Sequence, residues 1–200
     1  MGTVLVFHAG GFVYGDASSA AGYCQEFADA GYDSVSVDYP TYDYPGALRY
    51  SRHAALAARK QGLPTYAVGW SAGGTFAAML AALRDVNAGV AISAPTDLLR
   101  WNGTNKHYYR DMIKLRTLEA RRRGSPYYRY RPGLSCPLLL MHGRPPDRIV
   151  HYWQSVRFAR KDHLKLITLK HGHLKDPSSG PRAVRWIDKQ PGTGCAVRSP

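Results

Sequence analysis

The sequence has few of the features that mark fibrous, membrane or disulfide-rich proteins. Its 200 residues include three cysteines, and no apolar run approaches the roughly 20 residues that a membrane span needs. Cys24, Cys136 and Cys195 are too few for a disulfide scaffold, lack the spacing of a metal site, and by their odd number suit a reducing compartment. The apolar fraction of 44% and the charged fraction of 20% exclude a wholly disordered chain. A globular protein of about one domain remains.

The N-terminus lacks the signals of export and of lipid attachment. The first three residues lead directly into the apolar segment 4–7 with no basic segment before it, so no secretory signal is predicted. Val6 stands where a myristoylation site needs Ser or Thr. We therefore predict a cytoplasmic protein.

Acidic residues are scarce, because 14 Asp and Glu stand against 27 Lys and Arg, which gives a net charge of +13. The excess is concentrated in residues 100–131, where Asp111 and Glu119 are the only acids. A solvated basic helix is the simpler interpretation. Binding of nucleic acid or an anionic membrane surface stays open, since such a field attracts polyanions and interleaved tyrosines stack on bases. The residues concerned are Arg110, Lys114, Arg116, Arg121, Arg122, Arg123, Arg129, Arg131, Tyr108, Tyr109, Tyr127, Tyr128 and Tyr130.

Short apolar segments alternate with alanine-rich segments along the chain. The predicted strands are residues 3–7, 34–38, 66–69, 89–93, 137–142 and 164–169. The predicted helices are residues 17–30, 48–61, 72–84, 106–123, 150–161 and 181–189. Strands that alternate with helices form a parallel sheet covered by helices on both faces. We therefore predict one α/β domain over residues 1–188 with about six mostly parallel strands.

Two segments do not follow this alternation. Residues 95–137 form a basic, tyrosine-rich insertion that is longer than most connections, which makes it a candidate lid. Residues 189–200 are rich in Gly, Pro and Ser and are predicted to be a flexible tail.

The segment Gly69-Trp70-Ser71-Ala72-Gly73 matches the G-x-S-x-G pattern between a predicted strand and a predicted helix. A nucleophilic serine in this pattern lies on a sharp, strained turn, where small neighbours let the chain pass adjacent elements. The helix that begins at Ala72 directs its positive N-terminal end toward the serine oxygen. The context favours a nucleophile at Ser71 over an incidental serine in a glycine-containing turn.

Two adjacent glycines follow the first predicted strand, in His8-Ala9-Gly10-Gly11-Phe12. Glycines at this place let backbone N–H groups face a developing oxyanion with no side chain in the way. Alone, the pair is equally suited to a phosphate-binding turn, but the spaced Rossmann glycines and the lysine of a P-loop are absent. Together with the serine turn, the pair predicts an oxyanion hole.

These motifs resemble those of the α/β-hydrolases of the hormone-sensitive-lipase-like carboxylesterase group. Residues 8–12 are similar to the group's HGGGF motif, and residues 69–74 are similar to its GDSAGG motif. The turns at 38–40, 44–48, 95–98 and 125–126 also resemble segments of the group, so the resemblance runs from residue 4 to about residue 186. It implies an oxyanion hole formed by the amides of Gly10, Gly11 and Ala72.

The sequence also departs from this group. Ala9 replaces the first glycine of the HGGG motif, and Trp70 stands where the esterases commonly have Asp. The chain begins at what resembles the third strand of the full fold, so we expect neither the first two strands nor the N-terminal cap. The site would then be open at the top, with residues 95–137 as the only candidate lid.

The catalytic acid and base are expected later in the chain, because this fold uses the order Ser, Asp or Glu, His. Residues 142–150 resemble the group's HG-x-x-D-x-x-V motif with one extra residue, and Asp147 is the only carboxylate among them. Asp147 would orient the base, and it could also cap the next helix. After the last predicted strand, His173 follows Gly172 as in the group and is favoured over His171 as general base. A surface histidine and a His-x-His metal site are the alternatives, but no partnering acid or cysteine cluster is evident.

We therefore predict a serine hydrolase that cleaves small carboxylic acyl esters through an acyl-enzyme, with Ser71, Asp147 and His173 as the triad and without a metal or organic cofactor. Two other functions stay open: a formamide or amide hydrolase similar to the kynurenine formamidases, and a basic polyanion-binding protein on a hydrolase scaffold. Aromatic residues near the motifs are candidate walls of the acyl pocket, although such residues beside a sheet more often belong to the core. They are Phe12, Tyr14, Tyr42 and Trp70.

Overall fold

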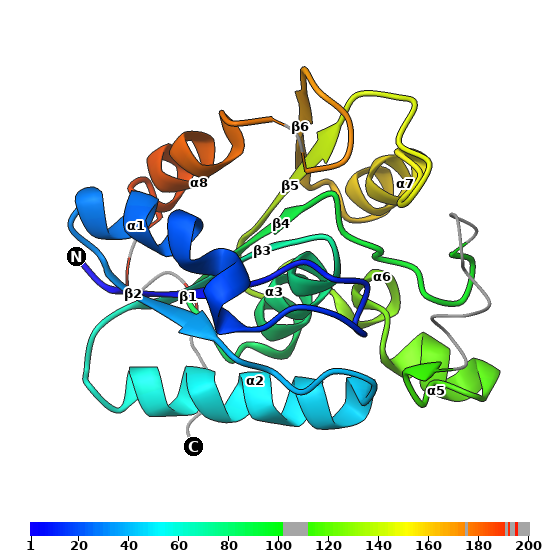
Figure 1. Cartoon of the computed structure of the whole chain (residues 1–200), viewed down its shortest axis with the longest axis horizontal. Helices are drawn as coiled ribbons and strands as arrows, with labels where there is room; N and C mark the ends of the chain where they lie inside the picture. The colour runs from blue at the N-terminus through cyan, green and yellow to red at the C-terminus, as the bar shows by residue number, and fades with distance from the viewer. Residues whose placement is uncertain (102–111, 175, 191, 193–194, 196–200) are drawn as a thin grey trace.

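The computed structural model describes residues 1–101, 112–174, 176–190, 192 and 195, and its centre is one six-stranded sheet (Figure 1). The strands are β1 Thr3–Phe7, β2 Asp33–Val37, β3 Thr65–Trp70, β4 Ala88–Ile92, β5 Leu138–Gly143 and β6 Lys165–Leu169. Their order is β2-β1-β3-β4-β5-β6, and every neighbouring pair is parallel. The predicted α/β fold with six parallel strands is confirmed.

Helices cover both faces of the sheet and enclose two apolar cores (Figure 1). One face carries the 3-10 helix η1 (Ala17–Ala20) and the helices α1 (Ala21–Asp29) and α8 (Ser179–Ile187). The other carries α2 (Tyr44–Arg59), α3 (Ala72–Leu83), α6 (Pro126–Arg129) and α7 (Trp153–Asp162). Val4 and Val6 of β1 lie in the core on the face of α1 and α8, whereas Leu5 and Phe7 lie in the core on the face of α2 and α3. A strand buried on both faces needs an almost continuous apolar sequence, as β1 has.

A side-chain cap explains where α2 begins. Asp43 Oδ1 accepts a hydrogen bond from the amide of Gly46 at 3.0 Å, so α2 begins at Tyr44, before the predicted start at residue 48. The predicted helix 106–123 is confirmed over α5, Leu118–Arg123, but residues 113–117 are not helical, so one continuous helix is wrong. Lys114 has a φ of 62°, a left-handed conformation that a helix does not accommodate. Residues 106–111 of that prediction lie outside the described residues.

Two contacts attach described residues of the predicted tail to the rest of the fold. Cys195 forms a disulfide with Cys136, and the carbonyl of Gly192 accepts a hydrogen bond from Asn87 Nδ2 at 2.6 Å. Cys24 has a free thiol. The odd number of cysteines did not predict this pairing, because only the fold brings residues 136 and 195 together.

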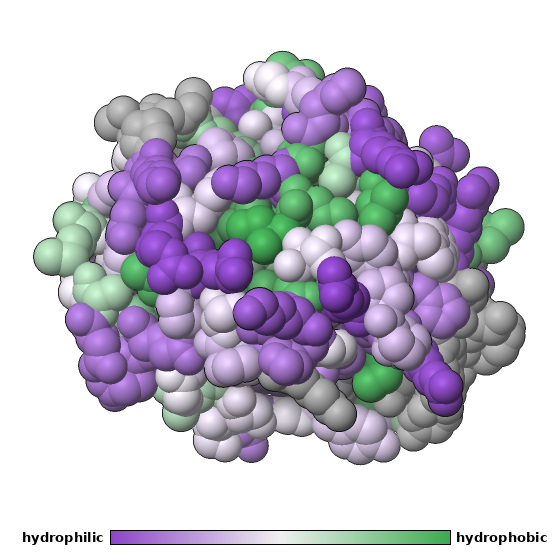
Figure 2. All heavy atoms as spheres, turned by 90° about the horizontal axis from the view of Figure 1, so that it is seen from above, coloured by the Kyte–Doolittle hydropathy of each residue, from purple (hydrophilic) through white to green (hydrophobic). Residues whose placement is uncertain are grey.

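One face of the molecule is largely hydrophilic (Figure 2). Figure 2 shows this face, on which a small group of apolar side chains near the middle is surrounded by hydrophilic ones. In the part of the chain that the structure describes, no helix has the length and apolar character needed to cross a bilayer. Most large apolar side chains are instead buried in the two cores.

Candidate active site

Ser71 lies on the sharp turn between β3 and α3. Its backbone angles are φ 50° and ψ −118°, a strained combination that is found mostly at functional sites. The amide of Ser71 donates a hydrogen bond to the carbonyl of Ile92 at 2.8 Å, which ties the turn to β4. Only 5% of the residue is exposed. The serine singled out in the sequence therefore has the backbone geometry of a nucleophile turn.

Close packing explains the glycine at position 73. A Cβ atom on Gly73 would overlap the carbonyl oxygens of Phe7 and His8 at the end of β1. The first turn of α3 therefore lies directly against the chain that leaves β1. This contact brings Ser71 and the glycine turn after β1 to the same edge of the sheet.

The turn after β1 presents free amides beside Ser71. Gly10 has a φ of 133°, and its carbonyl accepts hydrogen bonds from the amides of Val13 and Tyr14 at 3.0 and 2.9 Å. A side chain on Gly10 would overlap the Tyr14 carbonyl. Within the described residues, the amides of Gly10, Gly11 and Ala72 donate to no acceptor, and all three residues line the same cavity as Ser71. Amides in this arrangement can stabilise an oxyanion.

His173 connects Ser71 to Asp147. Its Nε2 lies 3.1 Å from Ser71 Oγ, and its Nδ1 lies 2.8 Å from Asp147 Oδ2. Because Nδ1 faces a carboxylate, it carries the ring proton, which leaves Nε2 to accept the proton of the serine hydroxyl. The structure thus brings together the three residues that the sequence analysis singled out, and His173, not His171, is the histidine at Ser71.

Asp147 is buried and surrounded by N–H donors. Its Oδ1 accepts from the amides of Ile149 and Val150, each at 3.0 Å, and its Oδ2 accepts from His173 and, at 3.2 Å, from His142 Nε2. Burial alone would raise the pKa of the Asp147 carboxyl, but the hydrogen bonds from the two histidines and the charge of His173 hold the pKa well below its usual value. Asp147 is therefore ionised at neutral pH. Its contacts with the two amides hold the turn at 147–150. The alternative role of Asp147 as cap of the next helix is wrong, because α7 begins at Trp153 and its N-cap residue is Tyr152.

Asp176 holds the loop that carries His173 and was not among the residues predicted from the sequence. Its carboxylate accepts from the amides of Lys170 and Ser178 at 2.6 and 2.9 Å and from the Ser178 hydroxyl at 2.6 Å. Burial works against ionisation, but these hydrogen bonds outweigh it and lower the pKa of Asp176 to about 2. An Asp two residues before a Ser near a helix start is a recognisable turn signal. Within the described residues, no group of three His, Cys, Asp or Glu side chains is suited to hold a metal ion.

A cavity of about 210 Å³ adjoins Ser71 and His173. Apart from His173, the described residues of its lining include no acidic or basic side chain. The remaining walls are mainly apolar. They are formed by Ala9, Gly10, Gly11, Tyr14, Ala72, Pro95, Trp101, Ile149 and Leu174.

Of the four aromatic residues predicted to form pocket walls, only Tyr14 lines this cavity. Phe12 is buried in the α3 core against Tyr44 and Phe76. Trp70 points to the opposite face of the sheet from the α3 core and stacks on a tyrosine of α1. Tyr42 is 41% exposed and is not part of the lining. The predictions for Phe12, Trp70 and Tyr42 are therefore corrected.

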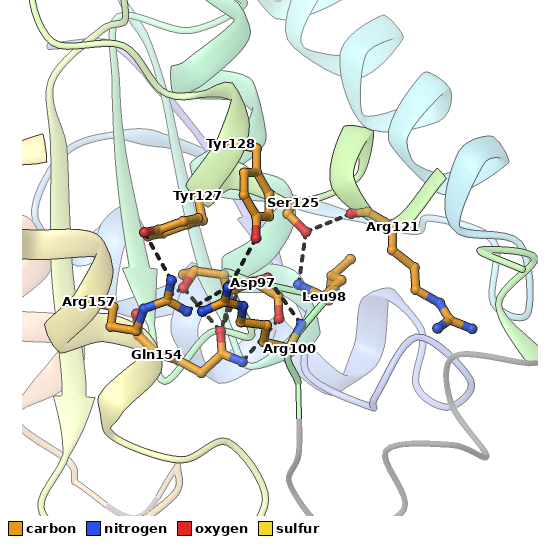
Figure 3. A network of polar contacts seen from close by, with 10 residues as sticks. Asp97, Leu98, Arg100, Arg121, Ser125, Tyr127, Tyr128, Gln154 and Arg157 are labelled. Atoms are coloured by element: carbon orange, nitrogen blue, oxygen red, sulfur yellow. Dashed lines mark hydrogen bonds and ion pairs between the residues drawn. The ribbon is translucent and has the colours of Figure 1, made fainter. Parts of the chain in front are cut away.

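A buried polar network fixes the segment after β4, which contributes Pro95 to the cavity (Figure 3). Asp97 is 1% exposed and accepts from Arg157 Nη1 at 3.0 Å, and its amide donates to Gln154 Oε1 at 2.7 Å. Figure 3 shows Arg157 and Gln154, both from α7, converging on Asp97, while Ser125 binds the amide of Leu98. The turn at 95–98 was noted in the sequence, but its partners were not.

The described tyrosines of the basic segment are engaged within the fold. Tyr130 is 6% exposed and packs on Phe158, and Tyr127 packs on Phe158 and under the Arg157 guanidinium. The Tyr128 ring lies 5.4 Å from the Arg122 guanidinium. Tyr130 is therefore too buried to stack on a base, whereas Tyr127 and Tyr128 are half-buried. Binding of nucleic acid through this segment stays a prediction. Tyr108, Tyr109 and Arg110 lie outside the described residues.

The parallel sheet, the strained serine between β3 and α3, and a histidine and an aspartate on the loops after β6 and β5 define the α/β-hydrolase class of fold. A family model described as alpha/beta hydrolase fold matches residues 4–123, more than half of the chain. The chain belongs to this family.

Known proteins agree with this assignment. Residues of the chain are 44% identical over 90 positions to the esterase LipI of Mycobacterium tuberculosis, a match that covers 39% of this chain and 28% of that protein. The structure of an esterase from Pyrobaculum calidifontis has a TM-score of 0.73 at 19% identity and covers 94% of this chain and 74% of that one. The esterase Est2 of Thermogutta terrifontis has a TM-score of 0.75 at 18% identity and covers 94% and 79%. At these identities the two structures show the shared fold.

Proposed function

We propose that the chain hydrolyses esters of short, uncharged carboxylic acids at Ser71. The observation that carries this proposal is the continuous hydrogen-bonded path from Ser71 through His173 to Asp147, beside a largely apolar cavity. Membership of the hydrolase family and the similarity to LipI, an esterase, support the same activity.

The first step is attack of Ser71 Oγ on the ester carbonyl carbon. His173 Nε2 takes the hydroxyl proton as the new bond forms, and the Asp147 carboxylate stabilises the resulting imidazolium. The carbonyl oxygen becomes an oxyanion, which the amides of Gly10, Gly11 and Ala72 stabilise. The strain at Ser71 and the exclusion of side chains by the two glycines hold the reacting groups in this arrangement before substrate arrives.

The second step releases the alcohol and leaves an acyl-enzyme. His173 returns its proton to the alcohol oxygen as the bond to the carbonyl carbon breaks. Water then attacks the acyl group with His173 again as base, and the carboxylic acid leaves Ser71 with its hydroxyl restored. All protons and electron pairs are supplied by ester, water and the side chains named, so this reaction needs no cofactor.

The cavity supports a short acyl group as the preferred substrate. A volume of about 210 Å³ is below the ~300–1,000 Å³ typical of sites for drug-sized ligands. The apolar side chains of Trp101, Ile149 and Leu174 favour an uncharged group. Pro95 and Trp101 come from the predicted insertion 95–137, which supports its role as a candidate lid over the site.

Hydrolysis of p-nitrophenyl esters from acetate to dodecanoate tests the proposal. We expect turnover that is highest for short acyl chains and that falls at least about 10³-fold in Ser71→Ala, because the nucleophile is lost. Ser51→Ala is the matched control, since Ser51 is a buried serine on α2 that binds only the carbonyl of Ala47. Folded wild type that hydrolyses a formamide but no ester would contradict the proposal and favour the formamidase alternative.

A further inference from the structure

His142 is a buried histidine that no step of the proposed reaction uses. It lies near the end of β5, has 0% exposure, and belongs to the strand face that points toward α7. Its Nδ1 lies 2.7 Å from Ser155 Oγ on α7, and its Nε2 lies 2.9 Å from the Val150 carbonyl and 3.2 Å from Asp147 Oδ2. Every polar atom of the ring therefore has a partner.

These contacts determine which ring nitrogen carries the proton. Both neighbours of Nε2 are acceptors, a carbonyl and a carboxylate, so Nε2 must be the donor. In the neutral ring, Nδ1 then accepts the hydroxyl proton of Ser155, which is 2% exposed. The hydrogen bonds run in one direction, from Ser155 to His142 and from His142 to Asp147.

The same carboxylate oxygen serves both histidines. Asp147 Oδ2 accepts from His142 and from His173, while Oδ1 accepts only backbone amides. The orientation of Oδ2 toward His173 is thus determined from the other side by a side chain on β5. A hydrogen-bond partner that lies behind a catalytic carboxylate in this way fixes its orientation, and with it the position of the histidine ring that it contacts.

We propose that His142, held by Ser155, is a positioning residue that orients the Asp147 carboxylate toward His173 and limits the negative charge that His173 experiences. This inference rests on the proposed function of the Ser71 site. It extends the hydrogen-bonded path to five side chains: Ser155, His142, Asp147, His173 and Ser71.

Loss of the His142 donor has two physical consequences. The carboxylate loses one of the N–H groups that define its plane, so fewer molecules present Oδ2 to His173 in the reactive geometry. Asp147 also loses one of the two imidazole N–H groups that partly neutralise its charge. His173 then experiences more negative charge, which favours its protonated form. The titratable groups near His142 are Asp147, Tyr152, whose ring centroid lies 5.4 Å away, and, through Asp147, His173.

Two amide substitutions separate positioning from simple packing. The amide nitrogen in His142→Gln is as many bonds from the backbone as Nε2, so it can donate to Asp147 and Val150. The amide nitrogen in His142→Asn is placed like Nδ1 and cannot reach Asp147. We expect kcat to fall roughly 10- to 100-fold in His142→Asn with KM nearly unchanged, and to recover most of this loss in His142→Gln.

The pH dependence gives a second readout. In His142→Asn the acid limb of the kcat/KM profile should move to higher pH, whereas in His142→Gln it should stay at the wild-type position. A residue that only fills space would lower activity by the same factor at every pH. Melting temperatures of all variants show which of them are folded.

Ser155→Ala keeps the proposal testable where a His142 variant does not fold. It removes one hydroxyl at the far end of the path, and we expect a smaller loss of kcat than in His142→Asn. Its effect should disappear when His142 is already Asn, because the two residues act through one contact to Asp147. Ser51→Ala, which removes a buried hydroxyl outside the path, should leave kcat and the pH profile unchanged.

The rate at which a fluorophosphonate labels Ser71 separates this inference from the proposed function. Ser71 Oγ displaces fluoride from phosphorus and gives its proton to His173. The labelling rate therefore reports activation of the serine without a carboxylic ester substrate. Wild type that is not labelled would contradict the proposed function. If wild type is labelled and His142→Asn, Ser155→Ala and Ser51→Ala are labelled at the wild-type rate, the role of His142 is overturned while the proposed function stands.

Discussion

The two sides of the candidate site are held in place by different means. The nucleophile side, formed by the turn after β1 and the Ser71 turn, depends on backbone conformation: Gly10 has a φ of 133° and Ser71 a φ of 50°. The acid–base side, formed by the loops after β5 and β6, depends on buried carboxylates. Asp147 and Asp176 accept hydrogen bonds from several amides and side chains of their own loops.

This difference determines which substitutions each side can tolerate. The nucleophile side has no room for added atoms, because its chain segments touch one another directly. The acid–base side is ordered mainly by hydrogen bonds to its buried carboxylates, so loss of an acceptor should disturb it most.

The largest effect is expected from Asp147→Asn on the acid–base side. Each oxygen of Asp147 faces only N–H groups, so the amide NH₂ of asparagine has no acceptor at either position. His173 would lose the partner that fixes its tautomer, and kcat should fall about 10⁴-fold while KM changes little. Steady-state kinetics on the best p-nitrophenyl ester measure this loss. A fall of less than tenfold in folded protein would show that Asp147 does not orient His173.

A smaller but still large effect is expected from Gly73→Ala on the nucleophile side. The added methyl group overlaps the carbonyls of Phe7 and His8, so the turn after β1 and the start of α3 must separate. Displaced oxyanion donors should lower kcat roughly 10²- to 10³-fold, and the overlap should destabilise the fold by ~1–3 kcal/mol. Urea unfolding and ester kinetics check both values.

Gly22→Ala is the matched control for this prediction. Gly22 lies in α1, and a Cβ atom there would have no neighbour within 4 Å. Since alanine favours a helix over glycine, the variant should keep full activity and gain about 0.5–1 kcal/mol of stability. Equal losses in both variants would mean that close contact at residue 73 is not what makes glycine necessary.

The same comparison explains what could be predicted from the sequence. Backbone-held features have local signatures, so the glycine pair at 10–11 and the serine turn at 69–73 could be recognised directly. The order of strands and helices followed from alternation along the chain. The positions of Asp147 and His173 followed only with the help of the family resemblance, since a single carboxylate or histidine in a loop carries little information.

Features held by distant side chains could not be predicted in this way. Gln154 binds the segment at Asp97, and Ser155 binds His142, through contacts that exist only after α7 packs on the sheet. The aromatic pocket candidates were wrong for another reason. Because successive side chains of a strand point to opposite faces of the sheet, Trp70 lies on the same face of β3 as Tyr66 and Val68, in the core away from α3. Its position next to Ser71 in the sequence hides this alternation.

The smallest effect expected is a difference in how the two sides make the free energy of unfolding depend on pH. Burial lowers the pKa of His8, in the turn after β1, from its ordinary value of 6.5, so the unfolded chain binds a proton that the folded chain excludes. This contribution to stability is complete above pH 6.5 and is lost as the pH falls from there toward the lower folded-state value. Asp176, with a pKa of about 2, also has a lowered value, but its contribution is lost only as the pH falls from about 4 to about 2.

Thermal unfolding of wild type, His8→Gln and Asp176→Asn at a series of pH values separates these contributions. The wild-type free energy of unfolding should decrease below pH 6.5 with a slope from His8 of at most about 1.4 kcal/mol per pH unit, because a single proton is involved. His8→Gln should lack this part of the decrease, whereas Asp176→Asn should retain it and lose only the steepening below about pH 4. If His8→Gln kept the wild-type slope between about pH 5 and 6.5, the proton taken up on unfolding would belong to a group other than His8, and the contrast between the two sides would fail in this respect.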